Sequence, residues 1–145
     1  MISDASTVTH LAQRTFFDRI KFMKFYSVVF ALVFTFLNLS LAHGQALTET
    51  QELLNSPTER AKVIKDDPNA QKADSDVKSL GLSDASQQKV YELSSKILKT
   101  LAEKSEGDSN RMNDAVLGYS HDPASMEKDL TPDQKKEINE ISGRK

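Results

Sequence analysis

The chain of 145 residues contains no cysteine, which excludes disulfides, cysteine-bound zinc, iron–sulfur clusters and thiol catalysis. It contains no tryptophan, and its five glycines form no phosphate-binding loop. The formal charge is −2, and acidic residues outnumber basic ones from Gln45 onward, so a basic surface for DNA or RNA is missing too. These absences predict a protein with no nucleic-acid partner.

Aromatic residues are missing from most of the chain as well. All seven phenylalanines precede residue 44, and beyond that point the only aromatic residues are Tyr91 and Tyr119. Leu, Ile, Val and Phe together make up just under a fifth of residues 45–145, a content at which disorder is suspected. This part of the chain is therefore predicted to be marginally stable and to need a partner to complete its fold.

An apolar segment with the order of an export signal begins at Met23. Lys24 precedes an apolar run that is densest over residues 28–37, about half of the roughly 20 residues that span a bilayer. The run ends in small residues that allow cleavage after Ala42, Gly44 or Ala46. We therefore predict a signal peptide over residues 23–44, membrane contact only during export, and a periplasmic or secreted product; an uncleaved anchor is the alternative.

Residues 1–22 fit a leader poorly because they place Asp4 and Asp18 in a region that should be purely cationic. A mistaken upstream start is the simplest interpretation, with Met23 as the true first residue. Whether translation begins at Met1 or Met23 is left open.

The apolar residues beyond the leader are spaced for helices. Val90, Leu93, Ile97 and Leu101 predict one helix over residues 84–105, capped by Ser83. Further helices are expected over 57–65, from 108 or 109 to Gly118, as a turn over 123–126 begun by Asp122, and over 132–142. The predicted fold class is mostly α: a small, marginally stable helical hairpin or bundle at residues 81–142. A polar, disordered or loosely helical N-terminal arm at 45–80, with a linker at 66–76, precedes it.

One apolar face is the candidate for either core or partner binding. Its members come from two predicted helices: Val90, Tyr91, Leu93, Ile97, Leu101, Ile138 and Ile141. Tyr91 lies beside the stripe, so we interpret it as partly exposed and available to a partner. The lysines on the opposite side of the helix are interpreted as a solvated face.

Leu130, Thr131 and Gln134 form a helix start in which Thr131 and Gln134 can cap each other reciprocally. The motif is similar to the LTxxQ motif of the Spy and CpxP group, small exported helical chaperones and stress sensors of the bacterial envelope, and residues 82–87 resemble an imperfect first copy. In size, export signal and polar character the chain also looks like the exported host-interaction-locus protein of predatory bacteria. These resemblances imply, respectively, a periplasmic chaperone or sensor and a factor in pilus or host-interaction control.

Residue patterns for catalysis or metal binding are not found. Ser120, His121 and Asp122 are neighbours in the chain and cannot align as a triad, and the acidic runs lack the ligand spacing of a calcium loop. We expect a non-enzymatic protein without cofactor or metal that binds another envelope protein and acts as a regulatory or accessory factor for an envelope assembly. The alternative is an LTxxQ-type chaperone or stress sensor, and a homodimer is left open.

Overall fold

The computed structural model describes residues 23–42, 44 and 46–142, and the regular structure within these residues is entirely helical. The predicted mostly-α fold class is confirmed. The predicted upstream extension, residues 1–22, lies outside the described residues. The elements are the apolar helix Met23–Ala42, α2 (Leu47–Asn55), α3 (Pro57–Asp66), α4 (Pro68–Lys78), α5 (Asp84–Lys104), α6 (Ser109–His121), the 3₁₀ helix η1 (Pro123–Asp129) and α7 (Pro132–Ser142).

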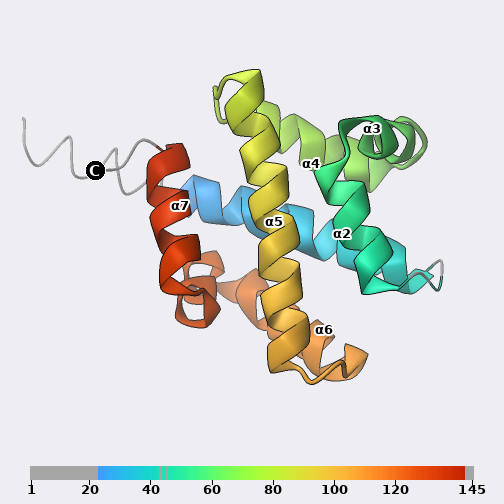
Figure 1. Ribbon diagram of the computed structural model, residues 1–145, viewed down its shortest axis with the longest axis vertical. Helices are drawn as coiled ribbons and strands as arrows, with labels where there is room; N and C mark the ends of the chain where they lie inside the picture. Colours follow the sequence, from blue (N-terminus) through green and yellow to red (C-terminus); the bar gives the residue numbers. More distant parts are fainter. Residues whose placement is uncertain (1–22, 43, 45, 143–145) are drawn as a thin grey trace, which may run out of the picture.

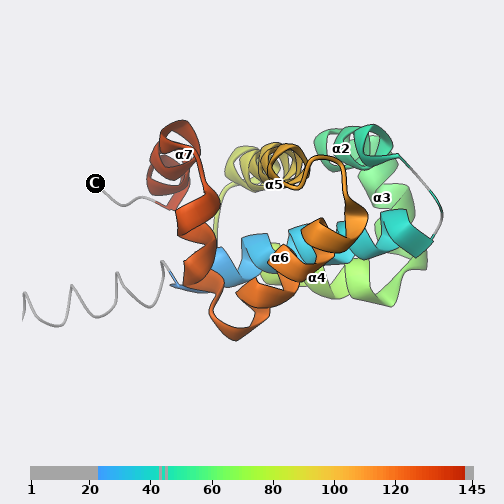
Figure 2. The ribbon, with the colours of Figure 1, turned by 90° about the horizontal axis from the view of Figure 1, so that it is seen from below.

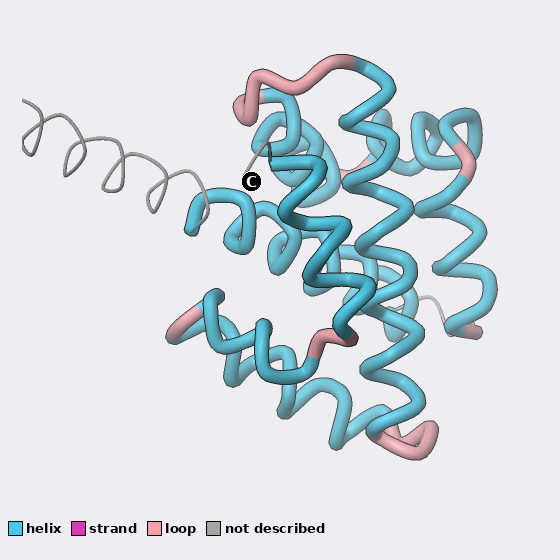
Figure 3. The backbone as a smooth tube through the Cα atoms, turned by 60° about the vertical axis from the view of Figure 1, so that its left-hand side comes forward, coloured by secondary structure: helices cyan, strands magenta, loops and turns pink. Residues whose placement is uncertain are grey.

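The helices form two layers. In one layer α5 lies between α7 and α2, and in the other the apolar helix lies between α4 and α6 and crosses beneath α5 (Figures 1 and 2). The long helix α5 contacts α2, α4, α6 and α7 and so connects both layers. From α2 onward short loops join successive helices, as the tube in Figure 3 shows.

Local capping explains where several helices begin. The side chains of Ser56, Asp67, Ser83 and Asp108 each accept a hydrogen bond from a backbone N–H of the first turn that follows. Each such bond satisfies a donor that has no partner within the helix. Three predicted helices agree with the structure to within one residue at each end. They are 57–65 for α3, 84–105 for α5 and 132–142 for α7.

Three local expectations were wrong. Residues 66–76 are not a linker, because Asp67 caps α4 and its residues Ala70, Ala73 and Val77 are buried. The helix expected to stop at Gly118 continues to His121 and ends just before the Asp122–Pro123 pair, since a residue that precedes proline disfavours the helical conformation. Asp122 is the N-cap of η1 as expected, although its side chain makes no capping hydrogen bond, but η1 continues to Asp129 instead of ending at residue 126.

A single apolar cluster joins helices from the whole described chain. It includes residues of the apolar helix, of α2 and α4 in the segment predicted as an arm, and of the helices after residue 81. The arm is therefore helical and packed in this structure. The low stability expected for residues 45–145 stays a prediction.

Candidate functional site

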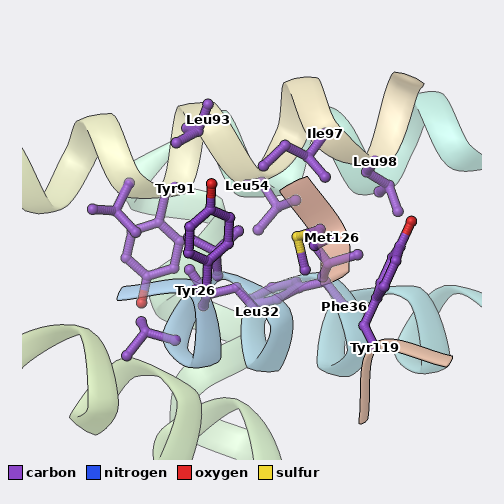
Figure 4. Packing of buried hydrophobic residues seen from close by; sticks show 14 of the residues in the cluster. Tyr26, Leu32, Phe36, Leu54, Tyr91, Leu93, Ile97, Leu98, Tyr119 and Met126 are labelled. Atoms are coloured by element: carbon purple, nitrogen blue, oxygen red, sulfur yellow. The ribbon is translucent and has the colours of Figure 1, made fainter. Parts of the chain in front are cut away.

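The most distinctive feature of the molecule is the place of the apolar helix, which lies between α4 and α6 while α5 crosses over it (Figures 1 and 2). We call this place between α4 and α6 the groove. Tyr26, Leu32 and Phe36 point from the apolar helix toward Leu93 and Ile97 of α5 (Figure 4). The side chains that this helix buries almost completely are Phe25, Tyr26, Val28, Val29, Leu32, Val33, Phe36 and Leu37.

Two polar contacts hold the apolar helix in one direction. Near its amino end the Lys24 ammonium donates to the backbone carbonyl of Ser79, which is the C-cap of α4, at 3.2 Å. Near its carboxyl end the hydroxyls of Ser40 and Thr50 are hydrogen-bonded to each other, and both side chains are buried. The helix therefore runs antiparallel to α4.

The outer side of the apolar helix is only half covered. The rings of Phe30 and Phe34 stack there, with centroids 5.7 Å apart and ring planes 26° from parallel. Beside them lies an open pocket of about 490 Å³, which Ala73 and other α4 residues line from the opposite side. Among the described residues Met23–Ala42 is also the one helix long and apolar enough to cross a membrane.

The residues of the predicted partner or core face all lie in the interior. Val90, Leu93, Ile97, Leu101 and Ile138 are at most 3% exposed, and Ile141 is 9% exposed. In this structure the face belongs to the core, with the apolar helix packed beneath α5. A partner can reach Leu93 and Ile97, toward which the apolar helix points its side chains, only if that helix leaves the groove (Figure 4).

Tyr91 is buried, which corrects the expectation of a partly exposed ring. The Arg60 guanidinium lies 3.7 Å from the ring centroid and donates to the Leu54 carbonyl, while the Tyr91 hydroxyl donates to Asp74 at 2.5 Å. Burial and the Asp74 carboxylate raise the pKa of Tyr91, and burial lowers the pKa of Arg60. The cluster joins α3, α4 and α5 and is explained as structural rather than as a binding site.

The Thr131–Gln134 capping box is confirmed in both directions. The backbone N–H of Thr131 donates to Gln134 Oε1 at 3.0 Å, and the backbone N–H of Gln134 donates to Thr131 Oγ1 at 3.2 Å. In addition, Gln134 Nε2 donates to Thr100 Oγ1 of α5 at 2.8 Å, and Leu130 is buried. The motif therefore begins α7 and also attaches it to α5.

Tyr119 makes a second buried link of the same kind. Its hydroxyl donates to the Asp129 carboxylate, whose other oxygen lies 3.6 Å from the Lys104 ammonium. Burial and the hydrogen bond to Asp129 raise the pKa of Tyr119. These contacts hold α6 and η1 against the end of α5.

Sequence reasoning missed the groove because it assigned the apolar segment to a signal peptide or, alternatively, to a membrane anchor. The signal that could have revealed the α4 wall is the spacing of Ala70, Ala73 and Val77, together with the Asp67–Pro68 helix start. Across the described part of the chain no three His, Cys, Asp or Glu side chains gather into a metal site. Comparison with family models, curated proteins and solved structures finds no match for this chain.

Proposed function

We propose that this chain is an exported, non-enzymatic binding protein of the bacterial envelope, and that it holds an apolar helix of another envelope protein in the groove between α4 and α6. The observation that carries the proposal is the identity of the segment in the groove. Residues 23–42 have the order of a removable export signal, yet they fill the interior of the bundle.

Removal of the apolar helix would expose the apolar side chains that now pack against it. Burying one large apolar side chain contributes about 1.5–3 kcal/mol, so the eight side chains of the apolar helix correspond to roughly 12–24 kcal/mol of transfer free energy. A small domain has a net stability of only about 5–15 kcal/mol. The mature chain is thus expected to stay loosely packed until another apolar helix takes the vacated place.

A regulatory or accessory role in an envelope assembly follows from this behaviour. A protein that orders only around its target is present in inactive form when the target is absent. The rival function, an LTxxQ-type chaperone, shares the open groove but predicts that unrelated unfolded proteins occupy it. The capping motif does not favour the rival, because its residues cap α7 and contact α5.

Site-specific photo-crosslinking in the envelope tests the proposal. A small photoreactive side chain replaces Ala73, which is buried on the α4 wall beside the apolar helix, and in a matched control it replaces Lys99, which is exposed on α5. We expect the Ala73 position, and not the Lys99 position, to crosslink the processed protein to an apolar helical segment of one envelope protein.

Three other results are informative. Crosslinks from Ala73 to many unrelated proteins would favour the chaperone. Crosslinks from Ala73 to residues 23–42 of the same chain would show that the helix is retained as core, and the proposal would fail. Equal crosslinking from Ala73 and Lys99 would place the binding surface elsewhere.

A further inference from the structure

The polar contacts of the apolar helix indicate which other helices can bind in its groove. We infer that the groove selects an apolar helix with a lysine or arginine at its amino end and a serine or threonine sixteen residues later, bound antiparallel to α4. This inference rests on the proposed function and adds the chemistry and the direction of the bound segment. Such a segment resembles a membrane-entering helix with a cationic start.

The amino end of the bound helix is set by the C-terminus of α4. Lys24 reaches the carbonyl of Ser79, at the C-terminal end of α4, where the last carbonyls of the helix carry a partial negative charge. A cation at this end is attracted to those carbonyls, whereas a helix inserted in reverse would place its own negative end there. The contact is exposed, so its contribution is small and decreases with salt.

The position along the groove is set by Thr50. This side chain is 1% exposed, and its hydroxyl pairs with Ser40 of the apolar helix. An occupant with an apolar residue at this place would bury the Thr50 hydroxyl without that partner, which costs more than the hydrogen bond itself gains. Sixteen residues of helix correspond to about 24 Å, so the Lys24 and Thr50 contacts together define both direction and register.

A competition experiment on the full chain tests the selection. The chain is folded intact and then cut at a protease site placed within residues 43–46, so that the groove keeps its helix without a covalent link. A fluorescent peptide with the sequence of residues 23–42 is then bound by exchange and displaced by unlabelled peptides. These are the native sequence, the same residues in reverse order, Lys24→Gln and Ser40→Ala.

We expect the native peptide to compete best and the reversed peptide not to compete. Ser40→Ala should bind about 5- to 100-fold more weakly, because Thr50 loses its partner, and Lys24→Gln about two- to fivefold more weakly at low salt. Replacing Thr50 by valine in the chain is the matched control. On that chain the difference between the native and Ser40→Ala peptides should shrink, because no buried Thr50 hydroxyl is left to lose its partner.

The outcomes separate the two proposals. If all four peptides compete equally, the groove binds apolar helices with no preference for direction or register. The inference then fails, while the proposed function stands. If the fluorescent native peptide never enters the cut protein, even at the temperature where its helices begin to loosen, the groove does not exchange its occupant and both proposals fail.

Discussion

Two phenylalanines on the apolar helix provide a direct test of its place in the uncleaved chain. Phe36 is 1% exposed on the inner side of this helix, and Phe34 is half-buried on the outer side, where it stacks with Phe30. We predict that Phe36→Ala lowers the free energy of unfolding by about 3–5 kcal/mol, the usual cost of deleting a fully buried ring. Phe34→Ala should cost about 1 kcal/mol, since Phe34 is only partly buried where it packs against the core and stacks with Phe30.

Urea unfolding followed by circular dichroism measures both values in the full chain, refolded without signal peptidase. For a denaturant slope of about 2 kcal/mol/M, Phe36→Ala should lower the midpoint by roughly 1.5–2.5 M, and Phe34→Ala by about 0.5 M. The pair is well matched because both changes remove the same side chain from the same helix. They therefore reduce its hydropathy, and any tendency to enter detergent or lipid, to the same extent.

The reasoning would be refuted if the two variants unfolded at the same midpoint. Equal and small losses would mean that residues 23–42 do not pack beneath α5 in the uncleaved chain. Equal and large losses would mean that the outer side of the helix is also covered, for example by a second copy. Gel filtration of the same samples distinguishes a second copy from an error in the packing.

Three further predictions concern processing, the motif of α7 and the buried tyrosines. N-terminal sequencing of the protein from the envelope fraction should find a first residue within 43–47, whereas a chain that retains residues 25–41 would be an anchor. Thr131→Ala should lower the free energy of unfolding by about 1 kcal/mol, and Gln134→Ala by about 1–3 kcal/mol, because Gln134 also donates to α5; equal losses in urea unfolding would contradict the second role. Above pH 10 the unfolded chain releases the phenolic proton of Tyr91, whereas the folded chain retains it because its Tyr91 pKa is raised. The free energy of unfolding should therefore fall by up to about 1.4 kcal/mol per pH unit. The urea midpoint of Tyr91→Phe should fall less steeply than that of the unchanged chain between pH 9 and 11.

The helices that could be predicted from the sequence are those whose ends are determined locally. The side chains of Ser83 and Thr131 each accept a hydrogen bond from the backbone N–H three residues later and so cap a helix. The starts of these two helices are therefore determined by residues that are close together in the sequence. The apolar spacing of Val90 and Leu93 then identified the inward side of α5. Both kinds of evidence act within a few turns of helix and need no knowledge of the rest of the chain.

The errors arose where burial depends on distant segments. Tyr91 was interpreted as half exposed because it lies beside the aliphatic stripe, but α5 is covered by helices on more than one side and buries a wider arc. Residues 66–76 were predicted to be a linker because they are polar and contain helix-breaking residues, although Asp67 and Pro68 begin α4, and Ala70 and Ala73 are buried. Composition alone does not distinguish these cases.

The location of residues 23–42 was the hardest feature to predict from the sequence. High hydropathy shows only that a segment is more stable away from water, in whatever apolar surroundings are available. A lipid bilayer and the interior of a helical bundle accept the same side chains. By length and composition residues 23–42 suit either destination. Every phenylalanine precedes residue 44, and Phe25 and Phe36 fill the core of a bundle whose remaining residues are poor in large apolar groups. A chain that loses this segment during export must therefore either remain loosely packed or obtain an equivalent helix from another protein, and for this reason the groove is where its binding activity should be sought.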